Sequence, residues 1–201
     1  YYRRIDDYIQ GTAVLPSPVT LPVIGVSGRA NGDPTPLQFT NVDAELYGFD
    51  MGFGARFTDS LRLDGNLSYT RGKRRDVNDN LYRIAPPSLR TTLSYRHSRW
   101  SLAIESVVVA RQDHISQTIT NDPANPNNSN AETPGYVIFN LVGSYQLPLA
   151  DSRIVAGVEN IGDNGYVDHL TGFNRVRLSD VARGQRLPGF GRNGFIALNV
   201  R

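Results

Sequence analysis

Histidines, arginines and aromatic residues are the side chains of this 201-residue chain whose types and spacing could do chemistry. Guanidinium groups make paired hydrogen bonds to carboxylate and phosphate oxygens, so arginines beside aromatics suit an anionic metal complex. Such residues gather in two stretches rich in loop-forming residues. The candidate ligand-binding residues are Arg111, His114, Tyr166, His169, Phe173, Arg175 and Arg177. For His114 and His169, a solvated loop histidine is the alternative interpretation.

A second cationic group lies in the polar stretch 71–82, which we expect to be a loop. Its members are Arg71, Lys73, Arg74 and Arg75. They could attract an anionic ligand, contact the phosphates of lipopolysaccharide, or simply be solvated.

Catalytic patterns are missing from the sequence. It contains no G-x-S-x-G, no H-E-x-x-H and no phosphate-binding glycine loop, so we expect neither an enzyme nor a catalytic residue. Soft sulfur ligands suit Cu(I), but there is no cysteine and Met51 is the single methionine. We therefore predict no resident metal and no cofactor.

Bulk composition narrows the class further. A net charge of +2 and a pI near 9.0 are too mild to indicate a nucleic-acid partner. Mean hydropathy is -0.35, and no apolar run reaches the about 18 residues that a membrane-spanning helix needs.

The elements that would position these residues are strands. Apolar and polar residues alternate over 39–57, 61–70, 89–96, 100–111, 136–147, 154–159 and 189–201, and 1–10 is expected to be the end of another strand. Tight turns at 58–60, 97–99 and 148–152 alternate with long connections at 11–38, 71–82, 112–134 and 161–188.

This alternation of tight and long connections is typical of outer-membrane barrels. They have short turns at one end, long loops at the other, and strands that are apolar outside and polar inside. A soluble β-sandwich is the alternative, but it does not predict this alternation of connection lengths. Aromatic girdle positions are expected at Tyr47, Tyr69, Tyr95, Trp100, Tyr136 and Tyr145. Mixed charges in or near the strands are expected to pair across the inner wall or with a plug. They are Asp43, Glu45, Arg62, Asp64, Arg90, Arg96 and Glu105.

Four motifs carry a family resemblance. NVDAELYGFDMG (41–52), IAPPSLRTTLSYR (84–96), GVENIGDNGY (157–166) and LPGFGRNGFIALNVR (187–201) resemble, in this order, segments of the C-terminal part of TonB-dependent outer-membrane receptors. Asp50 stands where the family usually has Glu, Ile161 and Gly162 replace Leu-Phe, and the family's C-terminal aromatic residue does not follow Arg201.

The resemblance implies an all-β fold in which residues 1–201 form the last eight strands of a 22-stranded transmembrane barrel, without the plug domain or TonB box. It implies TonB-dependent uptake of a metal chelate, with a ferric siderophore first and copper, haem or cobalamin as alternatives. Implied partners are TonB with its inner-membrane energising complex, outer-membrane lipid and lipopolysaccharide, and the barrel-assembly machinery. Two alternatives stay open, a small self-contained outer-membrane barrel with a structural or adhesive role and a secreted all-β binding module.

Overall fold

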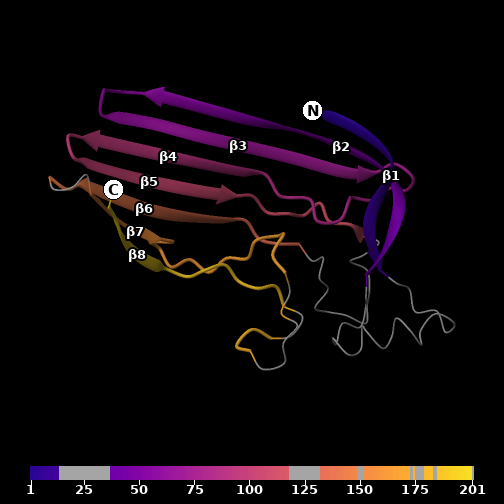
Figure 1. The fold of residues 1–201 in the computed structure, drawn as a ribbon. Helices are drawn as coiled ribbons and strands as arrows, with labels where there is room; N and C mark the ends of the chain where they lie inside the picture. The colour runs from indigo at the N-terminus through magenta and orange to yellow at the C-terminus, as the bar shows by residue number, and fades with distance from the viewer. Residues whose placement is uncertain are drawn as a thin grey trace.

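Eight strands form one antiparallel sheet in which each strand pairs with its neighbours in the chain (Figure 1). The computed structural model describes residues 1–13, 37–117, 132–148, 152–172, 174, 179–182 and 185–200. The strands are β1 (Tyr2–Ala13), β2 (Leu37–Arg56), β3 (Leu61–Arg74), β4 (Ser88–His97), β5 (Trp100–Val109), β6 (Tyr136–Gln146), β7 (Arg153–Glu159) and β8 (Asn193–Asn199). The predicted all-β antiparallel fold is confirmed. The sheet is open, with β1 and β8 at its edges.

One face of the sheet is apolar because the register aligns the apolar positions of successive strands. A row at mid-height joins Met51, Leu67, Leu89, Val108 and Val137 across five strands. Met51 keeps 47% of its surface exposed, and several large apolar side chains on this face are similarly open. A sandwich would cover such a face with a second sheet, whereas lipid leaves it free of protein contacts. No helix in the described part of the chain is long and apolar enough to cross a membrane.

The opposite face carries hydrogen-bonded polar side chains. Glu105 accepts from Arg90 Nη1 (3.2 Å) and from Asn140 Nδ2 (2.8 Å), which ties three strands together. Arg62 and Asp64 form an exposed ion pair at 2.6 Å. The predicted pairing across the polar wall is confirmed for these four charges, and it satisfies groups that would be costly to leave unpartnered in a barrel interior. It is wrong for Glu45, which lies on the apolar parity of β2.

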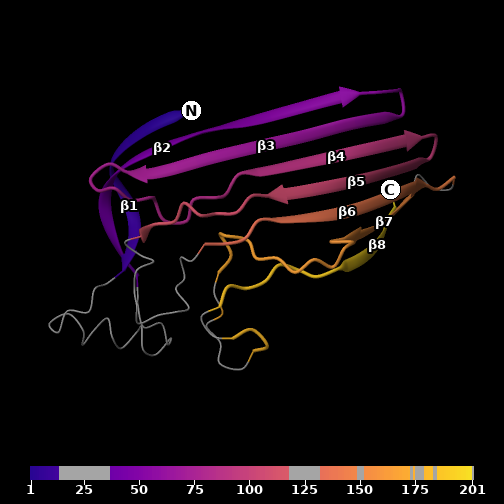
Figure 2. The ribbon, with the colours of Figure 1, turned by 180° about the vertical axis from the view of Figure 1, so that it is seen from behind.

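The two ends of the sheet differ in the length of their connections. Figures 1 and 2 show the turns β2–β3 and β4–β5 at one end, the tight-turn end, and the long connections at the other, the long-connection end. The β2–β3 turn is closed by Phe57 N, which donates to Leu61 O (2.9 Å), and by Leu61 N, which donates to Thr58 Oγ1 (3.0 Å). The predicted alternation of tight and long connections is confirmed.

The prediction of a loop from residue 71 is wrong for its first four residues. β3 continues to Arg74, because β2 offers a ladder partner for every position up to the pair Ala44–Arg74. The polar composition of this stretch suggested a loop, but the backbone groups of polar residues pair as well as those of apolar ones. Arg71, Lys73 and Arg74 are therefore strand residues, and Arg75 follows directly after the strand.

Aromatic side chains mark both ends of the apolar face. At the tight-turn end the rings of Trp100 and Tyr145 lie 4.6 Å apart, and at the long-connection end those of Phe49 and Tyr69 lie 5.8 Å apart. The predicted girdle position is wrong for Tyr136. Its register partner is Val109, which puts it on the polar parity of β6, one residue out of step with the apolar row.

Candidate functional site

The connection after β7 folds over the polar face at the start of β6. Tyr136 Oη donates to Asp168 Oδ2 (3.2 Å), and its ring lies 4.5 Å from the ring of Tyr166. Tyr166 also covers Gly189, whose backbone N donates to Tyr166 O (2.8 Å). The candidate Tyr166 is thus a half-buried packing residue that holds residues 166–171, here called the inner loop cluster, against the wall.

His169 is buried within the inner loop cluster, with 2% of its surface exposed. Its Nδ1 lies 3.1 Å from Thr133 Oγ1, a residue that comes just before β6. Burial, followed by the nearby Arg186 guanidinium, lowers the pKa of His169 to about 4, so the imidazole is neutral at pH 7. The interpretation of a solvated loop histidine does not fit this burial. Contact with a soluble ligand would require the side chain to be uncovered first.

Two arginines that the sequence analysis did not single out reach the inner loop cluster. Arg83 Nη2 donates to Leu170 O (2.5 Å), and Arg186 Nη1 donates to His169 O and to Thr171 O (3.3 Å). Burial lowers the pKa of Arg186. A carbonyl oxygen accepts a hydrogen bond without carrying a full charge, so these bonds place two guanidinium groups against residues 169–171. No sequence signal finds the pair, because the two arginines lie in different connections.

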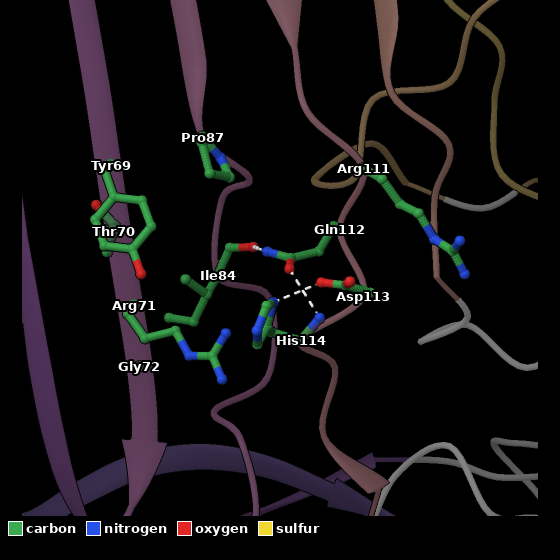
Figure 3. A pocket seen from close by; sticks show the side chains of 10 residues that line it. All are labelled: Tyr69, Thr70, Arg71, Gly72, Ile84, Pro87, Arg111, Gln112, Asp113 and His114. Carbon is green, nitrogen blue, oxygen red and sulfur yellow. Dashed lines mark hydrogen bonds and ion pairs between the residues drawn. The ribbon is translucent and has the colours of Figure 1, made fainter.

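Arg111 and His114 belong to a different group of neighbours. They line a hollow between the end of β3 and residues 84–87 and 111–114. Figure 3 shows Gln112 reaching across it, where Nε2 donates to Ile84 O (2.7 Å) and Oε1 accepts from the backbone N of His114 (3.1 Å). Arg111 points away from the hollow and pairs with Glu132, and His114 Nδ1 lies 2.5 Å from Asp113 Oδ1.

The remaining candidates divide into described and undescribed residues. Phe173, Arg175 and Arg177 lie outside the described ranges. In the second cationic group, Arg74 pairs with Asp76, and Arg75 Nη1 lies 2.8 Å from Asp6 Oδ1. Arg71 and Lys73 form no ion pair with a residue that the structure describes. Within the same ranges, no three histidine or acidic side chains are arranged to hold a metal ion.

Comparison with known proteins decides the family. A family model described as the β-barrel of TonB-dependent receptor-like proteins matches residues 1–161. The chain belongs to the TonB-dependent receptor β-barrel family. The match confirms the resemblance read from the motifs. Members of this family form barrels in the bacterial outer membrane. No curated protein matches the chain.

Solved receptors share the fold of this TonB-dependent receptor barrel segment. The copper transporter OprC is 24% identical with a TM-score of 0.76, over 98% of this chain and 27% of its own. The iron transporter FrpB from Neisseria meningitidis is 14% identical with a TM-score of 0.63, over 98% and 27%. A mutant of the ferric enterobactin receptor PfeA from Pseudomonas aeruginosa is 20% identical with a TM-score of 0.62, over 98% and 28%. The chain thus spans about a quarter of the length of these receptors.

The inner loop cluster is expected to open as the pH falls from about 6.5 to about 4. The pKa of His169 is lowered by burial, so the opened loop binds a proton more readily than the closed one. The closed loop is fully stable above the ordinary pKa and loses stability between that value and about 4. Hydrogen exchange of residues 166–171 in the full-length protein should speed up more than tenfold between pH 7 and pH 4, beyond the intrinsic pH effect.

The matched control is His169→Gln, which can keep a hydrogen bond to Thr133 but does not titrate. Asp168 is present in both proteins, so a difference between them reports His169 alone. The same corrected pH dependence in both proteins would contradict the prediction.

Proposed function

We propose that residues 1–201 form a C-terminal part of the barrel wall of a TonB-dependent receptor that imports a metal chelate, with a ferric siderophore as its ligand. The plug domain and TonB box would lie elsewhere in the full-length protein and would connect it to TonB and the inner-membrane energising complex. Family membership supports the receptor class. FrpB is named an iron transporter and PfeA a ferric enterobactin receptor, which supports iron as the cargo.

The observation that carries the ligand proposal is the cationic, aromatic character of the inner loop cluster. Arg83 and Arg186 bring two guanidinium groups to the backbone carbonyls of residues 169–171, Asp168 supplies one carboxylate, and His169 is neutral. Tyr136 and Tyr166 supply two rings that are tilted against each other, 4.5 Å apart. Arg83, Arg186 and Asp168 together carry a formal charge of +1. A ferric siderophore is an anionic complex of hard oxygen ligands around the metal, and arginines with aromatics would bind such a shell without displacing the ligands.

Copper is the second candidate, because OprC has the highest TM-score among the three receptors described above and is named a copper transporter. The chemistry of this segment argues against a bare Cu(I) ion. Thioether and thiolate ligands are what that ion prefers, and the one methionine, Met51, lies on the apolar face. A copper chelate with an anionic shell would suit the inner loop cluster as well as an iron one.

The outer membrane is the proposed location, with the apolar face of the sheet against lipid and the long connections outside the cell. The tight turns would then face the periplasm, and the barrel-assembly machinery would insert the chain. Binding residues proposed in the long connections are Arg111, His114, Tyr166, His169, Phe173, Arg175 and Arg177, together with Arg83 and Arg186.

Calorimetric titration of the purified full-length protein tests the ligand. Ferric catecholate and ferric hydroxamate chelates, a copper chelate and cobalamin are titrated in parallel. We expect a ferric chelate to bind, and Arg83→Gln to weaken that binding about tenfold, the effect of losing one charged hydrogen bond. Arg83→Lys keeps the charge and should lose less.

The matched control is Arg3→Gln. Arg3 is exposed and lies on β1 in register with Leu46 of β2, away from the inner loop cluster. Binding of cobalamin or copper alone would refute the ferric siderophore. Unchanged affinity in Arg83→Gln would remove the inner loop cluster from the binding site.

A further inference from the structure

The outward face of β1, β2 and β3 carries cations directly beyond its aromatic girdle. Arg71 and Lys73 share their parity with Leu67 and Tyr69, and the ladder has no shift, so both side chains leave the sheet on its apolar side. In register, Tyr2, Tyr47 and Arg71 form one row, and Arg4, Glu45 and Lys73 form the next. The three cations, Arg4, Arg71 and Lys73, are here called the outer cationic rows.

The height of these rows follows from strand geometry. Tyr69 lies eight residues from Leu61, which is in register with Tyr95 at the tight-turn end. At about 3.3 Å per residue and a tilt of about 40°, the two aromatic positions are about 20 Å apart along the membrane normal. Arg71 lies two residues beyond Tyr69 on β3, which adds about 5 Å along the membrane normal. An apolar band of about 25 Å ends at this level, so the outer cationic rows lie beside lipid headgroups.

The three cations of these rows form no ion pair with a residue that the structure describes. Arg74 and Arg75, their chain neighbours, pair with Asp76 and Asp6. Arg71 and Lys73 have no such pair, and Arg71 Nε is buried without a hydrogen-bond partner among the described residues. Glu45, held by Tyr2 Oη at 3.2 Å, is a single carboxylate among the three cations. The two rows alone therefore carry a formal excess of two positive charges, and Asp113 adds one carboxylate to the lining of the adjoining hollow.

Arg71 also borders the hollow with His114. Figure 3 shows its side chain extending from β3 toward this space, beside the ring of Tyr69. A phosphate group in the hollow would meet the guanidinium of Arg71, and Lys73 lies one row further along the same face of β3. Their Cα atoms are two residues apart on one strand, about 7 Å, which one phosphorylated sugar headgroup can bridge.

We propose that the outer cationic rows and the adjoining hollow bind the phosphate groups of a lipid headgroup in the outer leaflet, with Arg71 and Lys73 as the main contacts. This inference rests on the outer-membrane location proposed above. It narrows the predicted anion contact of Arg71, Lys73, Arg74 and Arg75 to its first two members, since the other two arginines are already paired.

Lipid retention by the full-length protein tests the proposal. The protein is placed in phosphatidylcholine nanodiscs that contain diphosphorylated or dephosphorylated lipid A, and bound lipid is counted by native mass spectrometry. Wild type should retain the diphosphorylated form, and Arg71→Gln with Lys73→Gln should retain about tenfold less or lower still, as expected for two cations at an anionic surface. Arg3→Gln with Arg99→Gln removes the same charge elsewhere and should retain it like wild type.

Several outcomes would overturn the proposal. They are equal retention by wild type and the Arg71/Lys73 variant, equal retention of dephosphorylated lipid A, and loss of the lipid when inorganic phosphate is added at a concentration that leaves the membrane intact. The single variant Lys73→Gln serves if the double variant does not fold. Chelate binding is measured on the same samples. Lost lipid retention with unchanged chelate binding separates this site from the transport function.

Discussion

Gly48→Ala is expected to prevent normal assembly of the barrel, whereas Gly143→Ala is expected to leave it intact. A Cβ atom on Gly48 would lie 2.0 Å from the carbonyl oxygen of Tyr69 and 3.0 Å from the Cα of Thr70. Both are backbone atoms of the neighbouring strand, so no side-chain rotation relieves the clash. Only a local separation of β2 from β3 would make room, and it would break ladder hydrogen bonds.

The expected loss of stability is about 3 kcal/mol or more, the upper range of overpacking in a well-packed site. Unfolding of the full-length protein in urea, followed by the heat-dependent change in gel mobility that folded barrels show, measures it. Gly143 is the matched control because it is also a strand glycine, and its added Cβ would meet its nearest atom, Leu102 Cδ1, at 3.7 Å. Equal stability of the two variants would show that β2 and β3 do not approach each other so closely.

The strands were predictable from the sequence because each one separates two different environments. Along β4, Leu89 and Leu93 alternate with Arg90 and Ser94, and a shift of one residue would put every charge into the apolar face. The same constraint does not act beyond the girdle. Arg71 and Lys73 lie there on the lipid-side parity, so alternation fades although the ladder continues, and the end of β3 was predicted four residues early.

The candidate site was less predictable because its contacts join distant connections. Arg83 and Arg186 meet at the inner loop cluster through carbonyl oxygens, and a carbonyl is present at every residue and leaves no pattern. His169 was singled out by its residue type, but its burial under the loop depends on Thr133, 36 positions away. Sequence reasoning finds the residue types that suit a ligand, and the long-range packing decides which of them are accessible.

Asn160 is expected to be the main structural residue of the motif GVENIGDNGY. The side chain is 2% exposed, and its Oδ1 accepts from Asn164 N (3.0 Å) while its Nδ2 donates to Asn164 O (2.9 Å) and to Phe190 O (3.1 Å). Its backbone N donates to Asn140 Oδ1 (2.8 Å). These bonds close the turn after β7 and join it to β6 and to the segment that leads into β8.

Asn160→Gly is the informative substitution, because the φ of 47° at Asn160 is as easy for glycine as for asparagine. The variant removes the three side-chain bonds without adding backbone strain, and it takes away a hydrogen-bond partner from Asn164 N, Asn164 O and Phe190 O. We expect a loss of about 3 kcal/mol in the free energy of unfolding, from about 1 kcal/mol or more for each lost partner. Urea unfolding of the full-length protein measures the loss.

Asp163→Gly is the matched control for Asn160→Gly, since it lies in the same turn with a φ of 52° and its exposed side chain accepts one bond, from Arg192 N (2.8 Å). It should cost about 1 kcal/mol or less. Chelate affinity of the folded fraction separates structure from recognition. If Asn160→Gly kept wild-type stability but lost chelate binding, the motif would belong to the ligand site. If it lost stability and kept its affinity, the motif would be a structural joint between three strands.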